Sequence, residues 1–117
     1  MKAKYLLDYC LSKDRAYLDF PFSEDYPVVK VSSLSGNKAR IFAEFYILSG
    51  REIMTFSTDA DTALALRGEY PDVIVRGWHC PSVQAKYKST VYIADMSDDL
   101  LKSFVDISYK RAVEIVK

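Results

Sequence analysis

The feature that most constrains the fold is a long strand-forming stretch that is interrupted once, by a serine–glycine pair. Residues 39–48 read ARIFAEFYIL and residues 51–57 read REIMTFS, and both runs are rich in β-branched and aromatic side chains. The two residues between them, Ser49 and Gly50, suit a tight two-residue turn. We therefore expect residues 39–57 to form an antiparallel hairpin.

Alternation of side chains along a strand predicts what each face of this hairpin contains. Strict alternation in the first strand gives two sets, one on each face: Arg40, Phe42, Glu44 and Tyr46 against Ile41, Ala43, Phe45 and Ile47. In the second strand, Met54 and Phe56 are expected on the buried face. One side of the hairpin should therefore pack against the rest of the domain.

Segments with helical or strand periodicity flank the hairpin on both sides. Thr58 suits the N-cap of one helix and Ser97 the N-cap of another, since each is followed by acidic residues that favour a first helical turn. We expect helices over residues 2–12, 59–69 and 98–116, and further strands over residues 28–32, 73–75 and 89–93.

This order of elements predicts an α+β fold. We expect an antiparallel sheet of about five to six strands, packed by the N-terminal, middle and C-terminal helices on one face. The 117 residues are enough for one ordinary domain, so residues 1–117 are expected to be a single domain. The composition, 50% hydrophobic and 14% aromatic, is typical of a globular chain rather than a disordered one.

Features that would direct the chain to a membrane or out of the cell are missing from the sequence. No apolar run approaches the roughly 20 residues that a membrane span needs, and the basic start lacks the apolar stretch of a signal peptide. We therefore expect a cytoplasmic protein with no membrane attachment. In that compartment Cys10 and Cys80 are expected to stay unpaired.

Charge is balanced overall but segregated along the chain. The 16 basic and 16 acidic residues cancel, which excludes a uniformly basic nucleic-acid-coating protein. Residues 26–43 and 73–94, however, contain lysine and arginine and no acid. If these two segments lie side by side, they form a positive surface on which aromatic rings stack beside phosphate-binding lysines. The candidate contacts are Lys38, Arg40, Arg76, Trp78, His79, Lys86, Tyr87 and Lys88.

A plainer interpretation of the same residues stays open. Trp78 can fill the edge of the core, and the lysines can be solvated charges that discourage pairing of strand edges. Charge alone does not decide between this interpretation and a nucleic-acid contact.

The chain's single histidine does not predict catalysis or metal binding. His79 and Cys80 are adjacent, so on an extended backbone their side chains point to opposite faces. There is no second histidine and no CxxC motif, whereas a structural zinc needs four ligands. Cys80 also lacks a base to activate its thiol. We expect no metal, no cofactor and no enzymatic activity.

Several short strings together resemble a known family. They are YLLDYCLSK at residues 5–13, ALALRGEYPDVI at 63–74, STVY at 89–92, and the pattern Asp106, Ser108-Tyr109 and Ala112-Val113. In this order they resemble the MmcQ/YjbR family, small bacterial proteins with a CyaY-like fold that are described as binding DNA through a double wing. The resemblance implies DNA as a partner of this chain.

The sequence departs from the family pattern where a binding surface would lie. Cys80 and Pro81 follow His79 in a loop about three residues longer than expected, and Lys88 stands where the family carries a tryptophan. Our leading hypothesis is therefore weak DNA binding through residues 26–43 and 73–94, by a monomer or weak dimer.

Two alternatives to DNA binding remain. In the first, the loop from Trp78 to Tyr87 docks a protein or a small ligand, which requires a concave aromatic pocket under the loop. In the second, the chain handles iron like a frataxin, which requires an exposed acidic ridge from the acids at 59–72 and 95–99.

Overall fold

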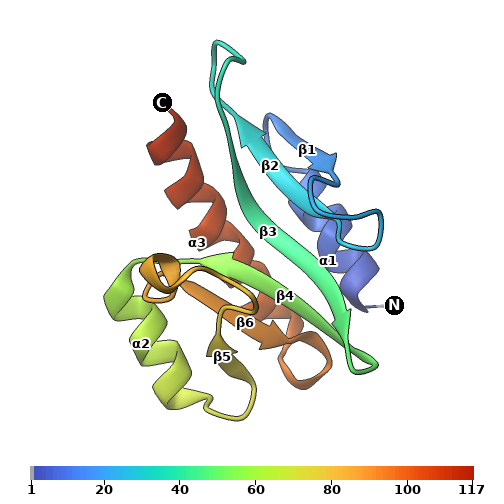
Figure 1. The fold of residues 1–117 in the computed structure, drawn as a ribbon, viewed down its shortest axis with the longest axis vertical. Coiled ribbons are helices and arrows are strands. Elements are labelled where there is room, and N and C mark those ends of the chain that lie inside the picture. Colours follow the sequence, from blue (N-terminus) through green and yellow to red (C-terminus); the bar gives the residue numbers. More distant parts are fainter. Residues whose placement is uncertain (1) are drawn as a thin grey trace.

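The computed structural model describes residues 2–117, which form one six-stranded antiparallel sheet and three α-helices. The strand order across the sheet is β1-β2-β3-β4-β6-β5 (Figure 1). In chain order the elements are α1 (Lys2–Leu11), β1 (Ala16–Asp19), β2 (Val28–Ser32), β3 (Ala39–Leu48), β4 (Arg51–Ser57), α2 (Ala60–Glu69), β5 (Ile74–Arg76), β6 (Lys88–Tyr92) and α3 (Asp98–Val116). Short 3₁₀ turns at Ser82–Gln84 and Ile93–Asp95 flank β6. The expected α+β class is confirmed.

The β3–β4 hairpin forms as expected. Its turn residues Ser49 and Gly50 both have positive φ angles, 51° and 78°. Positive φ at both positions gives a turn whose twist matches that of the flanking strands. The strands then pair from Leu48 with Arg51 as far as Glu44 with Thr55.

A β-bulge in β3 makes the prediction of strict alternation along that strand wrong. In the register with β2, Val29 lies opposite Ala43 but Lys30 lies opposite Ile41, so Phe42 is an extra residue. Phe42 therefore joins Ala43 in the core beneath the helices, and its ring packs edge-on against Tyr109 of α3. Ile41, which alternation placed with Ala43, lies on the opposite face of the sheet.

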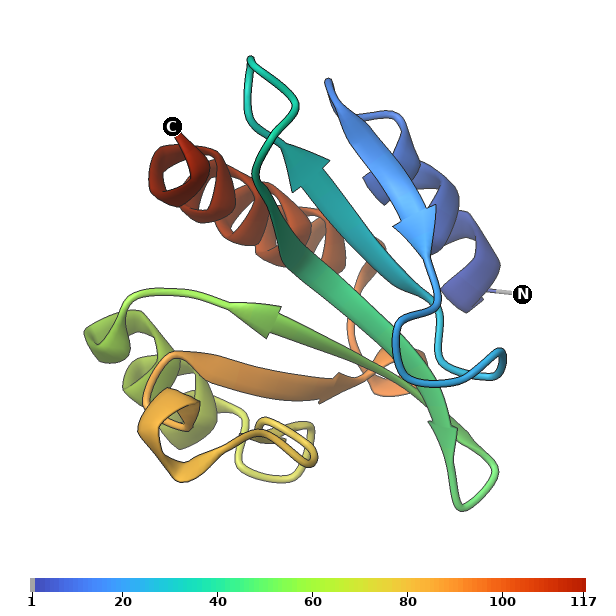
Figure 2. The same cartoon turned by 45° about the horizontal axis from the view of Figure 1, so that its top comes forward.

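Beyond the hairpin, β3 and β4 separate. The first half of β3 pairs with β2, while the end of β4 pairs with β6 (Figure 2). The buried Ser108 of α3 joins the separated strands, because its Oγ donates to the carbonyl of Phe42 (2.6 Å) and accepts from the N–H of Ser57 (3.0 Å). One serine thus satisfies two backbone groups that the split leaves without sheet partners.

Helices α1 and α3 cover one face of the sheet, which lies in front of them in Figure 1. Met54 and Phe56 belong to the core on this face, as predicted, and Phe56 stacks on Phe104 of α3 at 4.8 Å between ring centroids. No helix in residues 2–117 has the length and apolar character needed to cross a bilayer.

The two helices are tied to each other by polar contacts at the surface. Asp106 of α3 accepts a hydrogen bond from the Tyr9 hydroxyl (2.7 Å) and forms an ion pair with Lys13 (2.6 Å). The Tyr109 hydroxyl donates to the carbonyl of Asp14 (2.7 Å). The aspartate, serine and tyrosine of the pattern at 106–109 therefore all hold the architecture together.

The helix caps agree with prediction at one helix and differ at another. Ser97 caps α3 as expected, with its side chain accepting from the N–H of Leu100. The N-cap of α2 is Asp59 rather than Thr58: its carboxylate accepts from the N–H of Thr62 (2.8 Å). Thr58 is instead buried, and its N–H donates to the carbonyl of Tyr87. The predicted cap at Thr58 was wrong by one residue.

Candidate functional site

A pocket of about 640 Å³ lies on the face of the sheet opposite α1 and α3. Glu44 projects from this face because its neighbours Ala43 and Phe45 both belong to the helix-covered core. The pocket is lined by Phe22, Tyr26, Ile41, Glu44, Trp78, His79, Cys80, Pro81, Gln84 and Lys88. These residues come from β3, from the start of β6, from the segment before β2 and from the β5–β6 connection. The volume falls in the range of small-molecule sites.

One wall of the pocket is a cluster of aromatic rings around Trp78. The Trp78 ring stacks on Tyr46 with centroids 4.5 Å apart and planes 16° apart, and on Tyr26 at 5.7 Å and 23°. Phe22 meets Tyr26 edge-on, and the His79 ring lies 4.2 Å from Trp78. The cluster therefore offers a continuous aromatic surface of the kind on which flat ligands stack.

Hydrogen bonds to the sheet fix the position of Trp78. Its backbone N–H donates to the Oγ1 of Thr90 (2.8 Å), and that hydroxyl is bonded to the Oγ1 of Thr55 (2.7 Å). Thr55 in turn lies opposite Glu44 in the β3–β4 register. A row of side chains across three strands thus supports the aromatic wall.

The polar end of the pocket is built around the carboxylate of Glu44. This side chain is nearly buried, and the residue is 8% exposed. Its Oε1 accepts from the Tyr26 hydroxyl (3.0 Å), and its Oε2 forms an ion pair with the Lys88 ammonium (3.1 Å). Burial, followed by the charge of Glu44, raises the pKa of Tyr26, so the phenol stays protonated and keeps donating.

The backbone of the β5–β6 connection approaches the sheet closely at Gly77. A Cβ at this position would lie 2.8 Å from the Cβ of Lys88 and 3.1 Å from the Sγ of Cys80. The Gly77 N–H also donates to the Lys88 carbonyl (3.0 Å). Arg67 of α2 holds the other end of the connection by donating to the carbonyls of Ala85 and Lys88. Glycine is therefore required for the connection to seat over the strand.

The expectation that His79 and Cys80 face opposite ways is wrong. It assumed an extended backbone, but His79 has a positive φ of 54° and the chain turns there. Both side chains consequently line the same pocket. Cys80 and Cys10 are both buried and unpaired, as predicted, and burial raises the pKa of the Cys10 thiol to about 12.

The predicted contact residues fall into three groups. Trp78, His79 and Lys88 line the pocket. Arg76, Lys86 and Tyr87 lie in or beside the β5–β6 connection but outside the pocket. The Lys86 ammonium is 5.2 Å from the centre of the Tyr87 ring. Lys38 and Arg40 are exposed on the β2–β3 hairpin, which projects at the top of Figure 1.

The two acid-free segments do not form one continuous positive surface. Strand β4 lies between β3 and β6, so the strands of residues 26–43 and 73–94 are not neighbours, although Tyr26 of the first segment stacks on Trp78 of the second. Two of their lysines are also neutralised, Lys88 by Glu44 and Lys30 by Asp19 at 2.8 Å. The condition for a continuous positive surface, that the two segments lie side by side, is therefore not met by their strands.

Sequence reasoning missed half of the pocket's residues that bear chemistry. The missed side chains are Phe22, Tyr26, Glu44 and Gln84. Tyr46, which stacks on Trp78 but does not line this pocket, was missed as well. The sequence does contain a feature that could have identified Glu44: it is the single acidic residue inside the apolar run IFAEFYI. A carboxylate at such a position requires a partner when the strand is buried.

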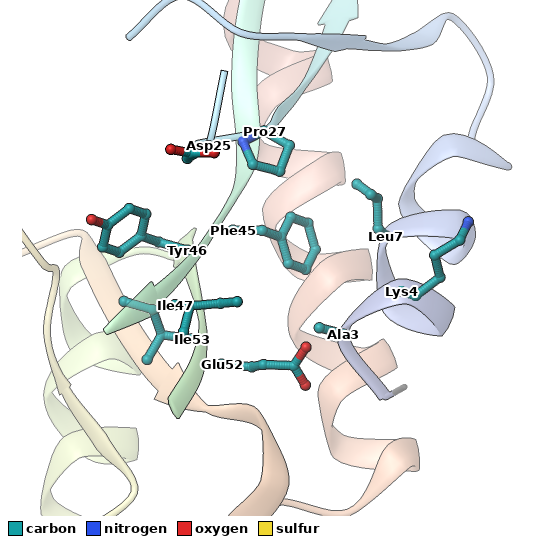
Figure 3. A pocket seen from close by; sticks show the side chains of 10 residues that line it. All are labelled: Ala3, Lys4, Leu7, Asp25, Pro27, Phe45, Tyr46, Ile47, Glu52 and Ile53. Carbon is teal, nitrogen blue, oxygen red and sulfur yellow. The ribbon is translucent and has the colours of Figure 1, made fainter. Parts of the chain in front are cut away.

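A smaller cavity of about 170 Å³ lies between α1 and the β3–β4 hairpin (Figure 3). Apolar side chains such as Leu7, Phe45 and Ile53 line it, and Lys4, Asp25 and Glu52 supply its polar groups. A cavity of about 150 Å³ holds little more than benzene. The larger pocket is the better candidate site, because it combines aromatic rings with a partly buried ion pair.

Among residues 2–117, no three histidine, cysteine, aspartate or glutamate side chains gather closely enough to hold an ion.

A six-stranded antiparallel sheet with helices on one face and an aromatic pocket on the other defines the structural class of this protein. A model of the YjbR family matches residues 11–111, and the chain belongs to that family. No curated protein matches the chain.

Two solved structures are similar to this one. A Deinococcus radiodurans protein with a DUF419 domain is 26% identical, with a TM-score of 0.80 over 92% of this chain and 75% of that one. A Pseudomonas syringae protein is 17% identical and shares the fold, with a TM-score of 0.74 over 96% of this chain and 99% of that one.

The close approach at Gly77 predicts a position-specific cost of adding a methyl group. Gly77→Ala should lower the free energy of unfolding by about 1–3 kcal/mol, because the new Cβ overlaps Lys88. Gly68→Ala is the matched control, since nothing lies within 4 Å of its added Cβ in α2. It should raise stability by roughly 0.5–1 kcal/mol. Urea denaturation measures both; equal effects of the two substitutions would contradict the described seating of the connection.

Proposed function

We propose that this chain is a small, non-enzymatic binding domain, and that the pocket under the β5–β6 connection takes a planar ligand. The observation that carries the proposal is the stack of Trp78 on Tyr46 next to the partly buried ion pair of Glu44 and Lys88. A concave aromatic pocket in this place is what the ligand-docking alternative requires. Apolar walls with a few oriented polar groups are typical of small-molecule sites.

The state of the polar groups favours binding over catalysis. Both oxygens of Glu44 already accept hydrogen bonds, one from Tyr26 and one from Lys88. The raised pKa of Tyr26 keeps its proton on the phenol. A general base must take up a proton from its substrate, whereas an orienting acceptor only has to receive hydrogen bonds. These partners therefore support a role in orienting a ligand.

A second candidate function, DNA binding, is favoured by the remaining cations. Lys38, Arg40, Arg76 and Lys86 are exposed, and within residues 2–117 their side chains form no salt bridge with an acid. They lie on two projecting features, the β2–β3 hairpin and the β5–β6 connection. Such cations neutralise phosphates without reading sequence, which gives weak and salt-dependent binding.

The pocket proposal predicts that planar heteroaromatic compounds bind next to Trp78, the only tryptophan of the chain. A panel of nucleosides, nicotinamide and quinazolin-4-one would be titrated while the indole N–H resonance of Trp78 is followed by NMR. We expect at least one compound to shift this resonance saturably at millimolar or lower concentration.

Two variants separate the pocket from the rest of the surface. Ile41→Ala, within the pocket, should weaken binding several-fold, whereas Ile47→Ala, beside the smaller cavity, should leave it unchanged. Absence of any saturable shift, or a shift lost equally in both variants, would refute the pocket proposal.

DNA binding is tested by fluorescence anisotropy with labelled duplex and single-stranded DNA at low salt. We expect dissociation constants of roughly 10⁻⁴–10⁻⁶ M, with a strong dependence on salt. Arg76→Ala/Lys86→Ala should reduce the slope of log affinity against log salt by about 2, one for each lost phosphate contact.

The control is a pair of cations on the helix face, Lys102→Ala/Lys110→Ala, which removes the same charge from α3. It should leave the DNA affinity nearly unchanged. Equal losses in the two double variants would show that only net charge matters and would reject a DNA contact at the β5–β6 connection.

A further inference from the structure

We infer that the pocket selects heterocycles with a guanine-type edge, in which a carbonyl oxygen lies next to N–H donors. The inference rests on the proposed ligand-binding function and names the chemical class of its ligand. It is carried by the ion pair of the buried Glu44 and the partly buried Lys88 at the polar end of the pocket.

This pair presents an acceptor and a donor side by side. The Lys88 Nζ lies 3.1 Å from the Glu44 Oε2. An ionised carboxylate has about four lone-pair positions and an ammonium has three N–H donors. Glu44 has two of its positions occupied, by Tyr26 and Lys88, and the bond to Glu44 uses one donor of Lys88. Glu44 can therefore still accept hydrogen bonds from a ligand in the pocket, and Lys88 can still donate hydrogen bonds to it.

Guanine complements this arrangement better than the other bases do. Its N1–H and exocyclic amino group are adjacent donors for the Glu44 carboxylate, and its O6 is an acceptor for the Lys88 ammonium. Adenine and cytosine instead place a bare ring nitrogen beside their amino group, and that lone pair would face the carboxylate. Uracil offers only one N–H between its two carbonyls. The expected order of affinity is guanine, then uracil, then adenine and cytosine.

The aromatic wall supplies affinity without supplying this selectivity. Every base has a π-face that stacks on aromatic side chains, so stacking beside Trp78 tolerates all of them. Discrimination must come from the hydrogen-bonding edge, which is where Glu44 and Lys88 lie. Gln84, which also lines the pocket, belongs to the exposed 3₁₀ turn and is not part of the ion pair.

The same base can arrive as a free nucleotide or within single-stranded nucleic acid. Arg76 lies beside the pocket, where its guanidinium donates to the carbonyl of Cys80 (3.3 Å). A phosphate attached to the base therefore has a cation near the pocket. In duplex DNA, by contrast, the guanine edge is occupied by pairing with cytosine, so a duplex cannot present it to Glu44.

The experiment measures nucleoside affinities through the Trp78 indole resonance. Guanosine should bind at least tenfold more tightly than adenosine or cytidine. Inosine, which lacks the 2-amino group, should fall between guanosine and adenosine. Glu44→Gln should weaken guanosine at least tenfold and leave adenosine within about twofold, because the amide provides one acceptor oxygen where the carboxylate provides two. Glu114→Gln, at an exposed glutamate of α3 outside the pocket, is the matched control and should preserve the preference.

The outcomes separate this inference from the proposed function. Equal affinities for guanosine and adenosine, or binding only of compounds outside the nucleosides, would overturn the guanine preference and leave the pocket as a ligand site. If no planar compound binds, the proposed function fails as well. If Glu44→Gln does not fold, the order of guanosine, inosine and adenosine on the unmodified chain still decides.

Two further ligands identify the source of the base. Guanosine monophosphate and a single-stranded trinucleotide with a central guanine are compared with the same trinucleotide annealed to its complement. Tighter binding of the monophosphate indicates a free nucleotide, and tighter binding of the single strand indicates a nucleic acid. Equal binding of duplex and single strand at Trp78 would overturn the assignment of the guanine edge.

Discussion

The ion pair between Glu44 and Lys88 joins two strands that are not neighbours in the sheet. Glu44 lies on β3 and Lys88 begins β6, with β4 between them. A nearly buried carboxylate without a partner costs several kcal/mol, so Glu44 requires Lys88 and the Tyr26 hydroxyl to stay close. That requirement brings the β5–β6 connection and the segment before β2 together over one face, and the pocket is the space that they enclose.

The two faces of the sheet have different roles: one packs against α1 and α3, and the other carries the pocket. On the helix side, Ser108 joins the strands where they separate, and Asp106 and Tyr109 fasten α3 to the region of α1. The residues at 106–109, which are part of the resemblance to the family, therefore stabilise the fold. On the open side, Lys88 stands where that resemblance expects a tryptophan, and here it is the partner of Glu44. The face that carries the pocket is where this sequence differs from the family pattern.

Local patterns in the sequence predict the elements well and the pocket poorly. The Ser49-Gly50 turn and the Ser97 cap follow from residues close in the chain, and both are confirmed. The bulge at Phe42 does not, because it is set by the register with β2 and by packing against α3. The left-handed turn at His79 is likewise set by tertiary contacts of the connection. Both displace side chains to faces that simple alternation does not predict.

The predicted contact residues show the same limit of prediction from local sequence. Trp78, His79 and Lys88 were identified from composition and do line the pocket. Tyr26 and Glu44, which give the pocket its polar end, lie far from them in the sequence and were missed. Pairing of Lys88 with Glu44 also removes a cation from the surface that charge segregation predicted. The charge of a surface can be predicted from the sequence only when the partner of each charged side chain is known.

A double-mutant cycle measures the coupling between Glu44 and Lys88, on which the arrangement of the pocket depends. Free energies of unfolding would be measured for Glu44→Gln, Lys88→Met and the double variant, with Lys4→Met and Asp8→Asn as a control cycle on an exposed pair. We expect a coupling energy of about 1–3 kcal/mol for the first pair and below about 0.5 kcal/mol for the control. Additive effects of Glu44→Gln and Lys88→Met, within about 0.5 kcal/mol, would contradict a pocket organised by this ion pair.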